Sequence, residues 1–455
     1  MSIFALLAVV ASLWVGDPSR PQLHLTVPSG WVNDPNGLSW RAGEWHFFCQ
    51  HNPYGVTWGN MSWYHLVSRD LLHWQPLGDV MTPDALGAMY SGSAVTDSEN
   101  TAGFGRGAHV LVYTAKGDQG GVQCLASSTD GRRYGKYAGN PVLRPKAKGA
   151  DRDPKVFWHA PTKRWVMALY VEKDGRKYLD ILNSSDLKSW ELQSELPGIG
   201  DLGKPGWLYE CPGLEELKVE GEDATAWVVW GADAGVCQIG AFDGRIFTPL
   251  QGAPLPSGVL QPSGEQAFYA AQTFNGAPDG RVLWVPWMRI PYRGNAVFSQ
   301  GFGLIQELTL RRTPAGLRLV RRPAREYAKL RDGAAVPLAA FDGELAEVSL
   351  AATLAKDGQV AFDLRGLRLS YDAASAKLTA GNRTVDWPVE KGRFAVTVFL
   401  DRGCAEIFSS DGLRMLPIPD LPSDPTKRKL SVLSSRGLAN PAFSVWRLKS
   451  IWLQM

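Results

Sequence analysis

Cysteine is scarce in this 455-residue chain, and its cysteines show no C-x-x-C spacing. The seven histidines likewise form no H-E-x-x-H or comparable pattern of metal ligands. Neither a zinc site nor a disulfide framework is therefore indicated. We expect a protein that works with no metal and no other cofactor.

Long hydrophobic runs are missing as well. The apolar stretch from Ile3 to Val15 is too short to span a bilayer. Its length suits the central region of a signal peptide, with residues 1–16 as the expected leader, although a buried first strand would read the same way. We therefore expect no membrane span and a secreted or periplasmic location.

Charge of one sign does not accumulate anywhere in the chain. The 48 basic and 45 acidic residues nearly cancel, leaving a formal net charge of +3. The pairs Arg311-Arg312 and Arg321-Arg322 are more typical of solvated strand faces than of a phosphate-binding patch. Nucleic acid is therefore not expected as a partner.

Tryptophan, glycine and proline are abundant, with 18, 48 and 30 residues, which favours strands joined by tight turns and an aromatic ligand surface. Similar apolar and aromatic segments recur at intervals of 55 to 64 residues, each interval long enough for one four-stranded sheet. We predict an all-β fold that begins with a five-bladed β-propeller over residues 20–325. The repeated segments are Trp45 to Gln50, His109 to Ala115, Trp165 to Val171, Trp227 to Gly231 and Val282 to Met288.

The repeat weakens near residue 325, after Arg322-Pro323-Ala324-Arg325. The segments that follow have the length and the alternating hydrophobicity of antiparallel strands. We predict a second domain, a C-terminal β-sandwich over residues 335–455. Its expected strands include Glu347 to Leu354, Gln359 to Leu364, Phe394 to Leu400 and Cys404 to Phe408.

Three acidic residues precede repeated strands by similar distances. Asp34, Asp153 and Glu210 lie 11, 12 and 17 residues before the segments that begin at 45, 165 and 227. Equivalent positions in different blades lie at the same mouth of a propeller, so three acids can converge on one ligand there. The spacing predicts an active site at that mouth.

Each acidic motif taken alone also has a plainer interpretation. Asp34-Pro35-Asn36-Gly37 is typical of a type I turn, Arg152-Asp153-Pro154 could be an ion pair on a loop, and Glu210-Cys211-Pro212 could be the end of a strand. The order of the three motifs within a blade repeat rich in tryptophan favours a shared functional site.

These motifs resemble glycoside hydrolase family 32, which contains invertases, inulinases and levanases. The family signatures read here as Trp31-Val32-Asn33-Asp34-Pro35-Asn36-Gly37, Arg152-Asp153-Pro154 and Glu210-Cys211. The resemblance extends in family order over roughly residues 22 to 455. Its further segments include Trp58-Gly59-Asn60, Tyr90-Ser91-Gly92-Ser93, Phe268-Tyr269-Ala270-Ala271-Gln272 and Val398 to Phe408.

The resemblance implies roles for individual residues in a retaining mechanism. Asp34 would be the nucleophile, Glu210 the general acid/base and Asp153 the stabiliser of the transition state. Arg152 would help to keep the aspartates ionised. The fructosyl pocket would be formed by Asn33, Gln50, Trp58, Ser91, Arg152 and Trp287, with core packing as the alternative role of the two tryptophans.

The implied activity is release of terminal β-D-fructose from levan, inulin or sucrose. Three alternatives stay open at this point: a non-catalytic fructan-binding protein on the same fold, an arabinan hydrolase that acts by inversion, and a fructosyltransferase. One departure from the family pattern is Ala267, where many members carry Asp, with Glu265 two residues earlier. A contact to a substrate hydroxyl is therefore expected to be missing.

Overall fold

The computed structural model describes residues 17–118, 120–145, 151–173, 176–197, 209–262, 265–294, 296–422, 424 and 426–452. The expected leader, residues 1–16, lies outside this part of the chain. The described helices are short 3-10 segments: η1 (Arg325–Leu330), η2 (Leu338–Ala340) and η3 (Glu390–Gly392). None of the helices within these ranges is long and apolar enough to cross a membrane.

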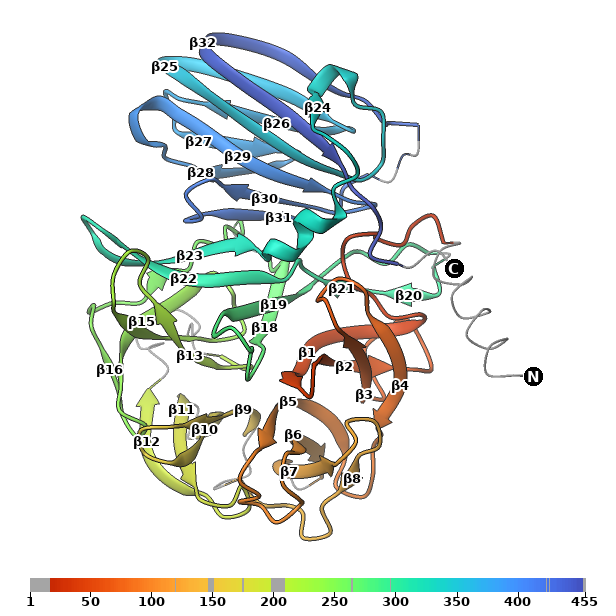
Figure 1. Ribbon diagram of the computed structural model, residues 1–455, viewed down its shortest axis with the longest axis vertical. Coiled ribbons are helices and arrows are strands. Elements are labelled where there is room, and N and C mark those ends of the chain that lie inside the picture. The colour runs from red at the N-terminus through yellow and green to blue at the C-terminus, as the bar shows by residue number, and fades with distance from the viewer. Residues whose placement is uncertain are drawn as a thin grey trace.

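Five antiparallel sheets are arranged as the blades of a β-propeller (Figure 1). The first three blades are four-stranded, and their strands follow one another in chain order. The first blade contains β1 (Gly30–Arg41), β2 (Glu44–Asn52), β3 (Ser62–Ser68) and β4 (Gln75–Met81). The second contains β5 (Ala88–Asp97), β6 (Ala108–Gly117), β7 (Gly120–Ser128) and β8 (Gly135–Lys136), and the third β9 (Arg152–His159), β10 (Arg164–Lys173), β11 (Arg176–Ser184) and β12 (Glu191–Pro197).

The fourth and fifth blades carry additional short strands. The fourth contains β13 (Gly213–Lys218), β14 (Thr225–Trp230), β15 (Val236–Phe242), β16 (Phe247–Pro249) and β17 (Leu255–Pro256). The fifth contains β18 (Phe268–Thr273), β19 (Val282–Met288), β21 (Gly301–Phe302), β22 (Gln306–Thr313) and β23 (Gly316–Pro323). The remaining strand, β20 (Phe298–Ser299), pairs in parallel with β1 and so joins the end of the propeller to its beginning.

The predicted five-bladed fold is confirmed, and the five repeated aromatic segments are the second strands of the blades. They form β2, β6, β10, β14 and β19. These strands are buried along most of their length, because neighbouring blades cover both of their faces. A strand covered on both faces reads as a continuous apolar run rather than an alternating one, which made the repeat visible in the sequence.

A buried polar cluster joins strands of all five blades at the propeller axis. The Lys155 ammonium on β9 lies 2.7 Å from a carboxylate oxygen of Glu215 on β13 and 2.8 Å from the hydroxyl of Thr273 on β18. Asn275, just after β18, donates its side-chain amide to backbone carbonyls of β5 and β9, and its backbone N–H to a carbonyl of β1. The Lys155 ammonium is paired with a carboxylate, and the Asn275 amide has hydrogen-bond acceptors on two blades. The cluster therefore holds the inner strands of the blades in a fixed arrangement.

The predicted β-sandwich follows the propeller. Its strands are β24 (Val336–Pro337), β25 (Ala346–Leu364), β26 (Leu367–Asp372), β27 (Lys377–Ala380), β28 (Arg383–Asp386), β29 (Arg393–Leu400), β30 (Ala405–Ser409), β31 (Met415–Ile418) and β32 (Leu430–Arg447). We propose residues 20–325 and 335–455 as the limits of the two domains. The last propeller strand ends at Pro323, and the first sandwich strand begins at Val336.

One feature of the sandwich differs from the prediction. Residues 347–354 and 359–364 were expected as two strands but belong to the single long strand β25. The first half of β25 pairs with β29 and the second half with β26, while β32 follows both halves. The pairing with β32 shifts register between Leu354 and Gln359, so the polar residues there mark an irregularity within one strand rather than a turn.

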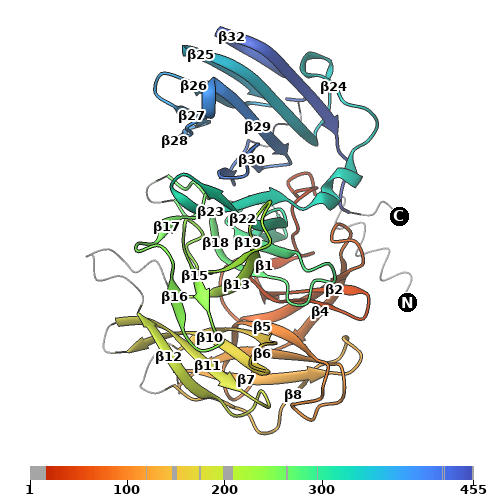
Figure 2. The same cartoon turned by 60° about the vertical axis from the view of Figure 1, so that its left-hand side comes forward.

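The sandwich packs against the fifth blade, with β30 close to β22 and β23 in two different views (Figures 1 and 2). A continuous hydrophobic cluster crosses this boundary and includes Tyr327, Phe399 and Phe408. The N-terminal segment lies here as well, because the backbone of Gln22 accepts a hydrogen bond from the N–H of Ile451. The two domains therefore share a core rather than meeting as independent bodies.

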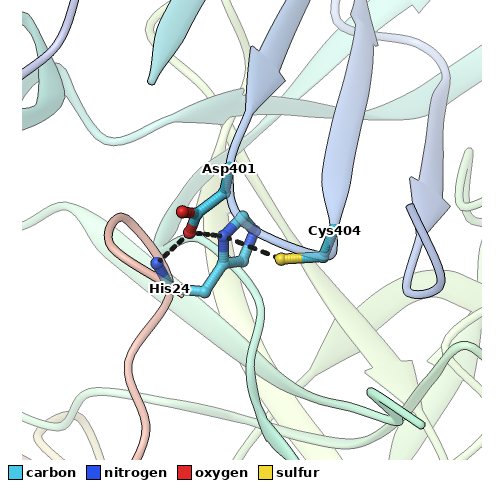
Figure 3. A group of neighbouring side chains, drawn as sticks. All are labelled: His24, Asp401 and Cys404. Carbon is cyan, nitrogen blue, oxygen red and sulfur yellow. Dashed lines mark hydrogen bonds and ion pairs between the residues drawn. The ribbon is translucent and has the colours of Figure 1, made fainter. Parts of the chain in front are cut away.

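A buried polar cluster fastens the same boundary (Figure 3). His24 of the N-terminal segment lies between two sandwich carboxylates, with Nδ1 2.8 Å from Asp401 and Nε2 3.2 Å from Glu406. The Cys404 sulfur lies 3.3 Å from Nδ1. Asp401 also accepts the backbone N–H groups of residues 22, 23 and 24, and Glu406 accepts that of Leu304. His24, Asp401 and Cys404 are close enough to hold a metal ion, but their polar atoms already have protein partners, so we interpret the cluster as an interdomain lock.

Candidate active site

Two of the three predicted acids lie where the regular pairing of an inner strand is broken. The β1–β2 register shifts between Val32 and Pro35, which places Asp34 on a β-bulge. A similar shift in the β9–β10 pair frees Asp153 and Pro154. Proline has no N–H to give to the ladder, so a sequence of acid followed by proline favours a bulge that turns the acid away from the sheet.

The turn and the loop in the plainer interpretations of these two motifs are wrong, although Arg152 and Asp153 do form an ion pair at 3.7 Å. Residues 34–37 lie inside strand β1, so they do not form a turn between strands. Residues 152–154 open strand β9 and are not part of a loop. Glu210 does lie near a strand end, three residues before β13 begins at Gly213.

Three site residues adopt a backbone conformation that L-residues rarely adopt. The φ angles of Asp153, Glu210 and Cys211 are 66°, 50° and 38°. None of them is glycine, so each carries the steric cost of the left-handed region. Such costs are characteristic of functional sites, where the surrounding fold holds a side chain in a required direction.

Cys211 and Arg152 connect the three acids, which come from three different blades. The Cys211 sulfur lies 3.3 Å from Asp34 Oδ2 and 3.6 Å from Asp153 Oδ2, and its backbone N–H donates to Asp153 at 3.0 Å. The Arg152 guanidinium donates to Glu210 Oε1 at 2.6 Å, and its Nε lies 3.7 Å from Asp153. The geometry therefore brings Asp34, Asp153 and Glu210 into one site.

Asp34 is oriented by neutral donors. The Ser91 hydroxyl on β5 donates to Oδ2, and the Asn33 amide donates to Oδ1 at 3.1 Å. The same Asn33 amide donates to Gln50 on β2. Burial is the largest influence on the pKa of Asp34 and raises it, with the charge of Glu210 acting in the same direction, while the hydrogen bond from Ser91 opposes the shift.

Asp153 is almost fully buried and carries a stronger shift. Burial raises its pKa to about 7, the charges of Glu210 and Asp34 add to the rise, and Arg152 opposes it. Arg152 was expected to keep the aspartates ionised, but its short ion pair is with Glu210. The Arg152 guanidinium thus contacts both carboxylates, but the contact to Asp153, at 3.7 Å, is the longer of the two.

The two predicted tryptophans differ in exposure. Trp58 is 56% exposed and its ring lies 6.3 Å from that of Tyr90, so the core-packing alternative is wrong for Trp58. Trp287 is 9% exposed and packs edge-on against Trp31 and Tyr269, with ring centroids 6.1 Å apart in each pair. Most of its surface therefore does pack in an aromatic cluster.

Tyr269 was missed as a site residue. Its hydroxyl donates to Glu210 Oε2 at 2.6 Å. It lies on the first strand of the fifth blade, where the β18–β19 register shifts between Tyr269 and Gln272. Site residues had already come from the first strands of three blades and from just before the first strand of the fourth. The equivalent position in the fifth blade was the signal that could have identified Tyr269.

Comparison with known proteins decides the family. Residues 24–323 match the N-terminal domain of glycosyl hydrolases family 32. The chain belongs to this family. It is therefore a glycoside hydrolase, and family 32 membership sets aside the alternative of an inverting arabinan hydrolase.

Relatives extend the similarity beyond the propeller. The levanase of Bacillus subtilis (strain 168) is 32% identical over 514 aligned residues, which cover 99% of this chain and 75% of the levanase. The crystal structure of exo-inulinase from Aspergillus awamori superposes with a TM-score of 0.84 at 24% identity, covering 96% of this chain and 99% of that one. The β-fructofuranosidase from Schwanniomyces occidentalis gives a TM-score of 0.78 at 22% identity, covering 98% and 99%. The two-domain fold of this family 32 enzyme is thus the fold of these structures.

Proposed function

We propose that this enzyme releases terminal β-D-fructose from fructans such as levan and inulin, and from sucrose, with retention of configuration. The observation that carries the proposal is the meeting of three carboxyl groups from separate blades around Cys211 and Arg152. The similarity to a levanase over 99% of the chain supports fructose-containing substrates.

In the first step, the Asp34 carboxylate attacks the anomeric carbon of the fructosyl unit. The bond from that carbon to the leaving oxygen breaks, and Glu210 gives its proton to the leaving oxygen. In the second step, water attacks the same carbon, Glu210 takes a proton from the water, and Asp34 is released. Ser91 and Asn33 hold Asp34 for the attack through the hydrogen bonds described above.

Asp153 stabilises the transition state by hydrogen bonding to hydroxyls of the furanose ring. Because its pKa is raised to about 7, a protonated Asp153 is available at neutral pH as a donor as well as an acceptor. Arg152, on the third blade, orients both Asp153 and Glu210 through its ion pairs with them. The chemistry consists of nucleophilic attack and proton transfer, both supplied by side chains, so the proposal includes no cofactor.

The pocket walls combine polar and aromatic surfaces. Asn33, Gln50 and Ser91 supply the polar side next to Asp34. Trp58 and Trp287 supply flat apolar surface for the sugar. We place the enzyme outside the cytoplasm, because several relatives of similar sequence are named as extracellular exo-inulinases.

A product time course on levan, inulin and sucrose tests the proposed function. We expect free fructose from the first time points, with linkage preference given by the relative rates. Binding of fructan without any fructose release would favour the non-catalytic alternative. Fructosyl oligosaccharides as the main products at high sucrose concentration would favour the transferase.

The role of Glu210 is tested with leaving groups of different quality. We expect Glu210→Ala to lower kcat on sucrose by about 100-fold to 10,000-fold, and to lower it much less on an aryl fructoside, because an acidic phenol needs little proton donation. The matched control is Glu191→Gln at an exposed position on β12. Equal losses on the two substrates would contradict the acid role.

A further inference from the structure

Arg289 lies beside the proposed acid/base residue. It directly follows strand β19, and its backbone N–H donates to the carbonyl of Ala267 at 2.9 Å. Its guanidinium carbon lies 4.6 Å from the ring centroids of both Tyr269 and Trp287. The cation therefore covers the aromatic wall whose tyrosine hydroxyl is bonded to Glu210.

The guanidinium of Arg289 uses few of its donors within the protein. Nη1 donates to the Gln266 side chain at 2.9 Å, while Nε is buried and has no hydrogen-bond partner among the described residues. No carboxylate in the described part of the chain forms an ion pair with it, in contrast to Arg152, which contacts Glu210 at 2.6 Å. The negative charges of Asp34 and Glu210 nevertheless act on it, opposing the burial that lowers its pKa.

The position of Arg289 relative to Glu210 indicates what it faces. A retaining enzyme attacks the fructosyl carbon from one side and expels the leaving group from the other, where the acid/base residue stands. Arg289 adjoins Glu210 through Tyr269, and a position next to the acid/base residue is a position near the leaving sugar. A planar guanidinium stacked on aromatic rings presents a fork of N–H donors that can bind two oxygens at once.

We propose that Arg289 is a specificity-determining residue that hydrogen-bonds the hydroxyl groups of the leaving sugar. This inference rests on the proposed β-fructosidase function. Because the contact is to the leaving group, Arg289 should increase kcat/KM only for substrates whose leaving group is a sugar. For a leaving group without ring hydroxyls, Arg289 should have no effect.

Two substrates with the same fructosyl unit separate this role from a general one. Sucrose has a glucose leaving group, and methyl β-D-fructofuranoside releases methanol, which has no ring hydroxyls for Arg289 to bind. For Arg289→Met we expect kcat/KM on sucrose to fall about 10-fold to 100-fold, the range of a hydrogen bond to a charged group. On the methyl fructoside we expect a fall below about threefold. Arg289→Lys keeps the charge but not the fork, so we expect an intermediate loss on sucrose.

The controls decide what a negative result means. Arg312→Met removes an exposed arginine of the fifth blade that is paired with Glu222 and should leave both substrates unaffected. Equal losses on both substrates for Arg289→Met, or no loss on either, would overturn the inference while leaving the proposed function intact. If the wild-type enzyme cleaves neither substrate, the proposed function itself fails. Thermal melting checks that each variant is folded. If Arg289→Met does not fold, the loss of kcat/KM on sucrose is compared with the loss on the methyl fructoside in Arg289→Lys instead.

Discussion

The active site and the interdomain lock each place carboxylates next to a buried cysteine and a cation. In the lock, Asp401 accepts three backbone N–H groups of the N-terminal segment as well as the His24 imidazole. In the active site, Asp153 accepts one backbone N–H, from Cys211, and has a longer contact to Arg152. Asp401 is therefore saturated by donors of the protein, whereas Asp153 has fewer of them.

The pKa shifts follow this difference. Burial and neighbouring negative charges raise the pKa of Asp34 and Asp153, so ionisation of the site carries a cost. In the lock, the partners of His24 overcome the effect of burial and raise its pKa well above the usual value, so the imidazole is held as a cation. Burial raises the pKa of the thiols of Cys211 and Cys404, and the neutral Cys211 can donate to Asp34.

The largest expected effect lies on the reactive side of this comparison. We expect Asp34→Asn to lower kcat at least about 10,000-fold, because a neutral amide cannot act as the nucleophile. The melting temperature should stay the same or rise, since a costly buried charge is removed. Fructose release and thermal melting measured on one preparation test both statements. Activity within tenfold of the wild type would remove Asp34 from the nucleophile role.

The matched substitution in the lock should have the reverse effect. We expect Asp401→Asn to lower the free energy of unfolding by about 3 kcal/mol, because it leaves His24 and several backbone donors without a full charge partner. Below its melting temperature, kcat should stay within about threefold of the wild type. Chemical denaturation and sucrose hydrolysis give the two values. Unchanged stability would show that the lock does not hold the domains together.

A smaller effect concerns the dependence of stability on pH. The folded-state pKa of Asp153 is about 7, above its value in an unfolded chain, so the folded protein loses stability from this group as pH rises from about 4 to 7. Asp153→Asn removes this loss of stability, because an amide does not ionise. We expect the variant to be more stable than the wild type by about 1–2 kcal/mol at pH 7, with the gain shrinking toward pH 4.

Melting curves of wild type and Asp153→Asn across this pH range provide the test. The gain should level off above pH 7, where the wild-type carboxyl is already ionised. A difference that is the same at pH 4 and pH 7 would contradict the shifted pKa. Asp186→Asn, at a half-buried position just after β11 of the third blade where hydrogen bonds lower the pKa of the carboxyl, is a control that should show no such gain.

The sequence supported the blade count and the identity of the acids for local reasons. Second strands covered on both faces leave apolar runs that recur at blade spacing. Asp34 and Asp153 are each followed directly by proline, a local signal for a bulge that the turn and loop interpretations overlooked. The irregularity in β25 was misread because polar residues within a long strand look like a turn when no pairing partner is visible.

Other features depend on contacts that no local pattern records. Cys211 reaches Asp34 across 177 positions, and His24 reaches Asp401 across 377. Tyr269 and Arg289 gain their meaning only from the position of Glu210 on a different blade. Periodicity reports which face of a strand is buried, but it does not report which residue lies opposite.

The sequence by itself determined the all-β architecture, the five blades and the family to which the enzyme belongs. Strand burial and short motifs depend on consecutive residues, so they can be recognised without knowledge of tertiary contacts. Only the tertiary structure decided which acid receives the short contact of Arg152, which carboxylate is saturated by donors and which cation stacks on the tyrosine that is bonded to Glu210. These properties depend on distances between blades, and the closure of the propeller sets those distances.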